Sequence, residues 1–150
     1  MALTTNQLFV LKLLDLAGKI ECKTKLQKLM FLAKVEEKVP LTYDFKKYHY
    51  GPFSFDLSDD LNALKQTDFI NESMTVMGSS EGSAMVKSVF TLTEDGKKEL
   101  EENKAKLSSE GVSALSITIN KWNSSSLDKI LKYVYSKYIT DESPKLAIAG

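Results

Sequence analysis

Apolar residues recur every three or four positions in three stretches of the first half of the chain, which is the spacing of an amphipathic helix. These stretches are residues 4–17, 23–38 and 54–66. In the second stretch the apolar stripe consists of Leu26, Leu29, Met30 and Ala33, and lysines lie mostly on the other side. Ser54 is a suitable N-cap for the third stretch. The pattern predicts three helices.

Two other parts of the chain have the pattern of extended strands. Residues 41–50 alternate aromatic and polar side chains, and Gly51-Pro52 follows them as a turn signal. Further on, two extended runs flank the glycine- and serine-rich "GSSEGS". We therefore expect a short strand, and then an antiparallel hairpin over residues 68–77 and 84–92 that packs beside the helix at 54–66.

The last third of the chain has helical spacing again. Thr93 is a candidate cap for a highly charged helix that contains Leu100 and Leu107, and a further helix is expected over 112–122. Ser126 is a candidate cap for the last helix, whose stripe contains Leu127, Ile130, Leu131, Val134, Tyr135 and Tyr138. The chain is expected to be one domain over 1–150 of the α+β class, with a C-terminal helical extension over about 106–140.

Charge is unevenly distributed, although the net charge of the 150 residues is zero. Residues 1–50 have nine lysines and five acids (+4), residues 51–110 have six and twelve (−6), and residues 111–150 have five and three (+2). Every basic residue is a lysine, apart from one histidine. Because arginine makes the commonest specific contact with guanine, a DNA-binding function would have to rely on lysine–phosphate contacts and on shape.

The composition gives no sign of export, of a membrane span or of a cofactor. No apolar run approaches the roughly 20 residues that cross a bilayer, and no signal-peptide pattern precedes the first helix. The single Cys22 has no second cysteine with which to form an internal disulfide. A cytoplasmic protein without cofactors and without membrane association is expected.

His49 is the only histidine, and three aspartates follow it closely. A catalytic zinc usually needs three protein ligands, and no second histidine or cysteine pair is present. We therefore predict a structural role for His49, no metal site and no catalytic residues. Cys22 is expected to act as a small apolar side chain, because nothing in the sequence identifies a base beside it.

The element order predicts a winged helix-turn-helix with a β-hairpin wing and additional C-terminal helices. "FTLTEDGKKEL" resembles the passage from wing to helix in PadR-like and MarR-like regulators. "KTKLQKLMFLA" followed by "YHYGPFSFDLSDDLNAL", together with "LKYVYSKY", resembles the YwgA-like proteins and, more distantly, the Panacea domain of SocA-type antitoxins. The resemblance implies a winged-helix module without catalysis, and Panacea antitoxins act by gripping a protein partner.

Two sets of lysines are candidates for contact with phosphates. Lys23, Lys25 and Lys28 belong to the second helix, where a charged face is either a phosphate-binding patch or an ordinary solvated surface. Lys46 and Lys47 stand beside tyrosines and either extend such a patch or protect a strand edge from aggregation. These five lysines are the predicted DNA-binding residues, and the expected ligand is double-stranded DNA.

The third helix argues against DNA, because Asp56, Asp59 and Asp60 near its start would repel phosphates. These acids, with Phe53 and Tyr135, are the predicted contact residues for a protein partner. The tyrosines of the last helix also predict a homodimer built by the C-terminal helices. Two hypotheses therefore stay open: a DNA-binding transcriptional regulator, favoured as the commonest use of the fold, and an antitoxin-like or adaptor module.

Overall fold

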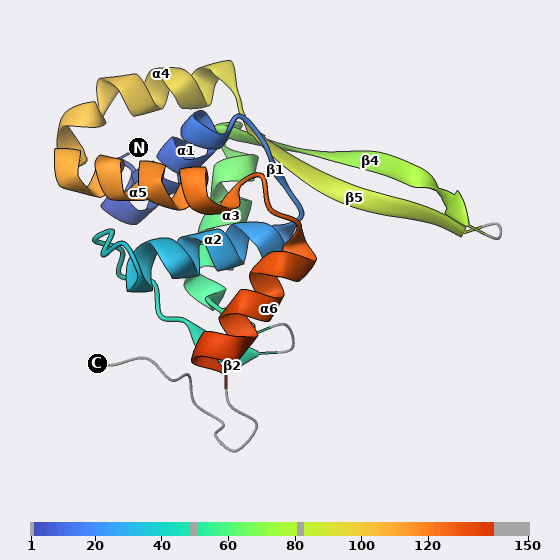
Figure 1. The fold of residues 1–150 in the computed structure, drawn as a ribbon. Coiled ribbons are helices and arrows are strands. Elements are labelled where there is room, and N and C mark those ends of the chain that lie inside the picture. Colours follow the sequence, from blue (N-terminus) through green and yellow to red (C-terminus); the bar gives the residue numbers. More distant parts are fainter. Residues whose placement is uncertain (1, 49–50, 81–82, 140–150) are drawn as a thin grey trace.

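The structure is a computed structural model that describes residues 2–48, 51–80 and 83–139. It is an α+β fold in which the helices form one body, with a three-stranded antiparallel sheet that extends away from it and a separate two-stranded sheet (Figure 1). The helices are α1 (Thr5–Ala17), α2 (Lys23–Val35), α3 (Phe55–Gln66), α4 (Glu94–Glu102), α5 (Ser109–Trp122) and α6 (Leu127–Tyr138). The strands are β1 (Ile20–Glu21), β2 (Lys46–Tyr48), β3 (Gly51–Phe53), β4 (Ile70–Ser80) and β5 (Ser83–Leu92).

Hydroxyl side chains fix the starts of most helices, as the sequence predicted for three of them. Ser54, Thr93 and Ser126 each accept a hydrogen bond from a backbone N–H in the first turn of α3, α4 and α6. Thr4 and Gln7 form a capping box at the start of α1. At the other end of α1, Gly18 adopts a φ of 81°, which glycine accepts without strain.

The predicted hairpin is confirmed. β4 and β5 pair antiparallel from Ile70 opposite Leu92 outward, and their ribbon extends away from the helical body (Figure 1). β1, which the sequence analysis missed, adds a third strand, so that the sheet order is β1-β5-β4. Two residues are too few to show strand alternation, and Ile20 reveals its strand character only through pairing with Phe90.

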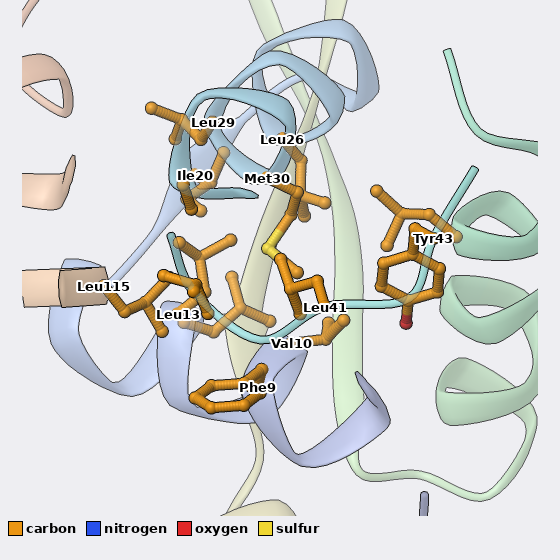
Figure 2. Close-up of a cluster of buried hydrophobic side chains, with 14 of the residues drawn as sticks. Phe9, Val10, Leu13, Ile20, Leu26, Leu29, Met30, Leu41, Tyr43 and Leu115 are labelled. Carbon is orange, nitrogen blue, oxygen red and sulfur yellow. The ribbon is translucent and has the colours of Figure 1, made fainter. Parts of the chain in front are cut away.

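The core lies between α1, α2, α5 and the base of the sheet. Figure 2 shows Phe9 and Leu13 of α1 in one cluster with Met30 of α2 and Leu115 of α5. α5 approaches α1 so closely that a Cβ at Gly111 would stand 2.7 Å from the Phe9 ring. The expected extension over about 106–140 is therefore not an appendage to a finished core, because α5 and α6 both contribute buried side chains to it.

Three predicted boundaries were wrong. Gly51-Pro52 lies in β3, which pairs with β2, instead of forming the turn itself. The helix predicted over 23–38 ends at Val35, and the charged helix ends at Glu102, before Leu107. His49 lies outside the described residues. Within the part of the chain that the structure describes, no helix is long and apolar enough to cross a membrane.

Candidate interaction surface

α2 is the central helix of the molecule, and its lysines do not form the solvated face that the sequence predicted. Every residue from Lys25 to Ala33 is buried. Lys25 is 9% exposed and Lys28 only 1%. Their placement on the solvent side was wrong because β3 covers α2 on one side while α5 and α6 cover it on another, so that no face of this segment is left to water.

Each buried ammonium group reaches a backbone carbonyl of another element. The Lys25 Nζ donates to the Asn123 oxygen at 2.6 Å, and the Lys28 Nζ donates to the Pro52 oxygen at 2.7 Å. The aliphatic stem of lysine suits such a path through apolar surroundings. Burial lowers the pKa of Lys25, and it lowers that of Lys28 to about 8. Both side chains hold elements of the fold together and are largely shielded from solvent.

The other three predicted DNA contacts are exposed. Lys23 is the first residue of α2, and Lys46 and Lys47 lie on β2. Lys46 also pairs with the exposed Asp44, at 3.7 Å between nitrogen and oxygen. The predicted phosphate patch is therefore split into two buried lysines and three exposed ones.

Three rings form an exposed cluster, here called the aromatic corner, where β2 and β3 meet the start of α3. Tyr48, Phe53 and Phe55 have ring centroids 5.0 to 5.4 Å apart. Strand pairing sets Tyr48 opposite Gly51 and Lys46 opposite Phe53, which brings Tyr48 and Phe53 to one face. Tyr48 is 47% and Phe55 55% exposed, an unusual placement for large apolar side chains.

α2 holds the backbone of this corner in place. The buried Gln27 amide donates to the Ser54 oxygen and accepts from the Ser54 nitrogen, both at 2.9 Å. Ser54 in turn caps α3, and Lys28 binds the carbonyl of Pro52, which lies two residues earlier on β3. The "KLQKL" and "YGP" motifs thus contact each other directly. The periodicity of neither motif alone predicts this contact. The signal in the sequence was that the two motifs occur together in one chain.

The outer face of α3 is polar and acidic. Its exposed residues are Phe55, Asp56, Asp59, Asn62, Ala63 and Gln66. Asp60 differs from the expectation, because its carboxylate accepts hydrogen bonds from the Tyr43 hydroxyl at 2.6 Å and from the Gln7 amide at 3.1 Å. The pKa of Tyr43 is raised above its ordinary range. Burial is the larger cause, and the neighbouring Asp60 carboxylate is the second. Asp56 and Asp59 are therefore available to a partner, whereas Asp60 is engaged within the fold.

α6 docks on the end of α2 through one carboxylate that the sequence analysis did not single out. Glu36 Oε2 accepts hydrogen bonds from Tyr133 at 2.6 Å, Tyr138 at 2.7 Å and Lys137 at 2.8 Å. Burial alone would raise the pKa of Glu36, but these three donors outweigh it and hold the pKa below its usual value. Two of the tyrosines that suggested a dimer interface thus have partners within the chain.

Tyr135 lies on another side of α6 and is partly exposed. A Cβ built at Gly51 would stand 3.9 Å from its ring, so Tyr135 borders the aromatic corner. Of the five predicted partner-binding residues, the fold therefore gathers Phe53, Asp56 and Tyr135 around one corner. Asp59 follows one helical turn later on α3.

The wing has an apolar face that continues outward from the core. Met74, Val76 and Val86 are exposed, and the pairing of Val76 with Val86 sets them on one face with Glu72. Glu72 binds Lys65 of α3, which orients this face toward α3. Residues 73–86 contain one charged side chain, Glu81, and no lysine.

A cleft of about 480 Å³ separates the base of the wing from the start of α6. Its charged groups are already engaged: Lys87 pairs with Glu21, and Lys25 binds Asn123. Cys22 also lines the cleft, and its Sγ accepts a hydrogen bond from the Lys25 N–H, so it caps α2 instead of acting only as a small apolar group. No three potential metal ligands cluster within residues 2–48, 51–80 and 83–139.

No protein-family model matches the chain, and no curated protein matches it.

Proposed function

We propose that this chain is a non-enzymatic winged-helix module that binds a protein partner through the aromatic corner and the outer face of α3. The observation that carries the proposal is the charge of that face, which exposes two aspartates and no lysine. Exposed aromatic side chains beside such a face are typical of protein interfaces, where Tyr, Trp and Phe are enriched.

The winged-helix part of the proposal is supported by the order of the elements. α1, β1, α2 and α3 are followed by the β4–β5 ribbon, and β1 pairs with β5 to close the sheet. In this arrangement α3 takes the place of the recognition helix and the ribbon takes the place of the wing. The proposed contact surface therefore occupies the position with which a DNA-binding relative would meet the duplex.

Several observations weigh against DNA as the ligand of that surface. A duplex is bound mainly through cations that replace counterions along the phosphates. Lys25 and Lys28 are buried, Lys65 is paired with Glu72, and the outer part of the wing has no lysine. Only Lys23, Lys46 and Lys47 of the predicted set are left to contact DNA.

Capture from a lysate of the source organism, with and without nuclease, tests the proposal when it is combined with variants. We expect nuclease-resistant capture that is lost with Phe55→Ala. Capture should be kept with Ile117→Ala, because Ile117 is an exposed apolar side chain on another helix, α5.

A gel-shift series at low and moderate salt forms the second arm. Retardation of duplex DNA that weakens with Lys46→Glu and Lys47→Glu would contradict the proposal and restore the DNA-binding hypothesis.

A further inference from the structure

The exposed carboxylates of α3 have no ion-pair partner in the part of the chain that the structure describes. Asp56 and Asp59 lie one turn apart, and neither forms an ion pair with any described residue. The only lysine of α3, Lys65, is bound to Glu72. Further along the same face, the exposed Asn62 and Gln66 offer amide groups. The middle of the surface therefore presents negative charge together with neutral polar groups.

Apolar groups flank this acidic stretch at both ends. Phe55, at the first residue of α3, belongs to the aromatic corner. Beyond the last turn, the wing face that carries Met74 and Val76 is directed toward α3 by the Lys65–Glu72 pair. The 12 residues of α3 span about 18 Å at the helical rise per residue, with one apolar group at the start of the helix and the other beyond its end.

We propose that the segment of the partner that binds here is cationic in its middle and apolar at both ends, with a length close to that of α3. This inference rests on the proposed function and names the chemistry of the partner. Lysine or arginine side chains of the segment pair with Asp56 and Asp59. One apolar end packs on the aromatic corner, and the other packs on Met74 and Val76, whose flexible thioether and branched side chain adapt to a partner surface.

The rings of the aromatic corner pack against one another, whereas the formal charges of this surface lie on the aspartates of α3. Phe55 meets Phe53 and Tyr48 edge to face, at interplanar angles of 73° and 78°. Rings that contact one another in this way leave no space between them for a cationic head group. The aromatic corner is therefore an apolar platform, and selectivity for charge comes from α3.

Fluorescence anisotropy with three synthetic peptides of the length of α3 tests the inference on the full chain. The first peptide has leucines at both ends and lysines in the middle. The second replaces the lysines with glutamate, and the third replaces the leucines with serine. We expect the first peptide to bind more tightly than either of the others by at least about tenfold, with an affinity that falls as salt is added.

Charge reversal locates the binding site. The double variant Asp56→Lys with Asp59→Lys should lower the affinity for the first peptide by about tenfold or more and raise the affinity for the second. Glu102→Lys, a reversal of an exposed acid on α4, should change neither. Met74→Ser should lower the affinity for the first peptide, and the variant should still bind the first peptide more tightly than the second. Thermal unfolding of each variant verifies that it is folded.

Three results would overturn the inference: equal binding of the first two peptides, no binding of any peptide, or unchanged affinity in the double aspartate variant. If capture from lysate still depends on Phe55 in that situation, the proposed function stands and only the partner chemistry is wrong. Retardation of duplex DNA in the gel-shift series would contradict both the proposed function and this inference. Self-association that is lost with the double aspartate variant would identify a second copy as the occupant and would likewise contradict a cationic partner.

Discussion

α2 and α3 use their charged residues in opposite ways. α2 is buried along nine consecutive residues, and its polar side chains bind backbone groups of neighbouring elements. α3 buries only Leu57, Leu61 and Leu64, and presents Asp56 and Asp59 to solvent. A charge on a helix therefore indicates a ligand-binding role only after its burial is known, and in this molecule the acidic helix is the accessible one.

The largest expected effect comes from removing the amide that joins α2 to α3. Gln27→Ala should lower the free energy of unfolding by about 4 kcal/mol, because it leaves the buried Ser54 N–H without a partner, removes one of the two hydrogen bonds that the Ser54 C=O accepts, and leaves a cavity at a fully buried site. Gln66→Ala is the matched control on the exposed face of α3, with an expected change within about 0.5 kcal/mol. Urea denaturation measures both. Equal effects would mean that α2 does not hold the aromatic corner in place.

How far the sequence predicts this contrast depends on the range of the interactions. The caps of α3, α4 and α6 and the hairpin follow from local signals, and they were predicted. The burial of Lys28 was not, because helical spacing assigns lysine to solvent and carries no information about a strand that packs on top. The Glu36 cluster joins residues about 100 positions apart, and no local pattern indicates it.

The buried ammonium of Lys28 should make stability depend on pH in the alkaline range. Its pKa is about 8 in the folded chain, against an ordinary value of 10.5 for a solvated lysine, so the unfolded chain binds more protons between these values and stability rises with pH. The expected gain is about 3 kcal/mol between pH 8 and 10.5. Lys28→Met should remove this rise, whereas Lys98→Met, at an exposed site on α4, should keep it. Urea denaturation across this range would refute the assignment if both variants retained the slope.

The cluster at the end of α2 should show a dependence of the same sign at acidic pH, where stability also rises with pH. The depressed pKa of Glu36 contributes stability that is present above the unfolded value of about 4.5 and is lost as pH falls through the folded value. Glu36→Gln should cost about 2 kcal/mol and increase hydrogen exchange in α6. Glu37→Gln loses one ion pair with the exposed Lys121 and should cost less than about 1 kcal/mol. Equal exchange of α6 amides in the two variants would contradict this role of Glu36.

The smallest expected effect on stability lies on the outer face of α3. Phe55→Ala should change the free energy of unfolding by less than about 1 kcal/mol, because Phe55 is more than half exposed and its ring contacts are with the other two exposed-side rings of the aromatic corner. Asp59→Asn should leave the stability unchanged within about 0.5 kcal/mol. Larger losses in urea denaturation would show that this face serves the fold and not a partner.

Lys25→Glu and Lys28→Glu do not serve as tests of DNA binding, because each would place a carboxylate in a buried site beside a carbonyl oxygen. Lys46→Glu and Lys47→Glu change exposed side chains on β2 instead. The homodimer stays a prediction. Light scattering of a Tyr135→Ser variant examines it without removing α6, whose Ile130 and Val134 belong to the core.

Photo-crosslinking from position 55 tests the central claim most directly. A photoreactive phenylalanine analogue replaces Phe55 in the full chain, a second variant carries it at Ile117, and both are irradiated in lysate of the source organism. The account predicts nuclease-resistant protein adducts at position 55 and none of the same adducts at position 117. Adducts at position 55 that consist of nucleic acid, or identical adducts at the two positions, would contradict it.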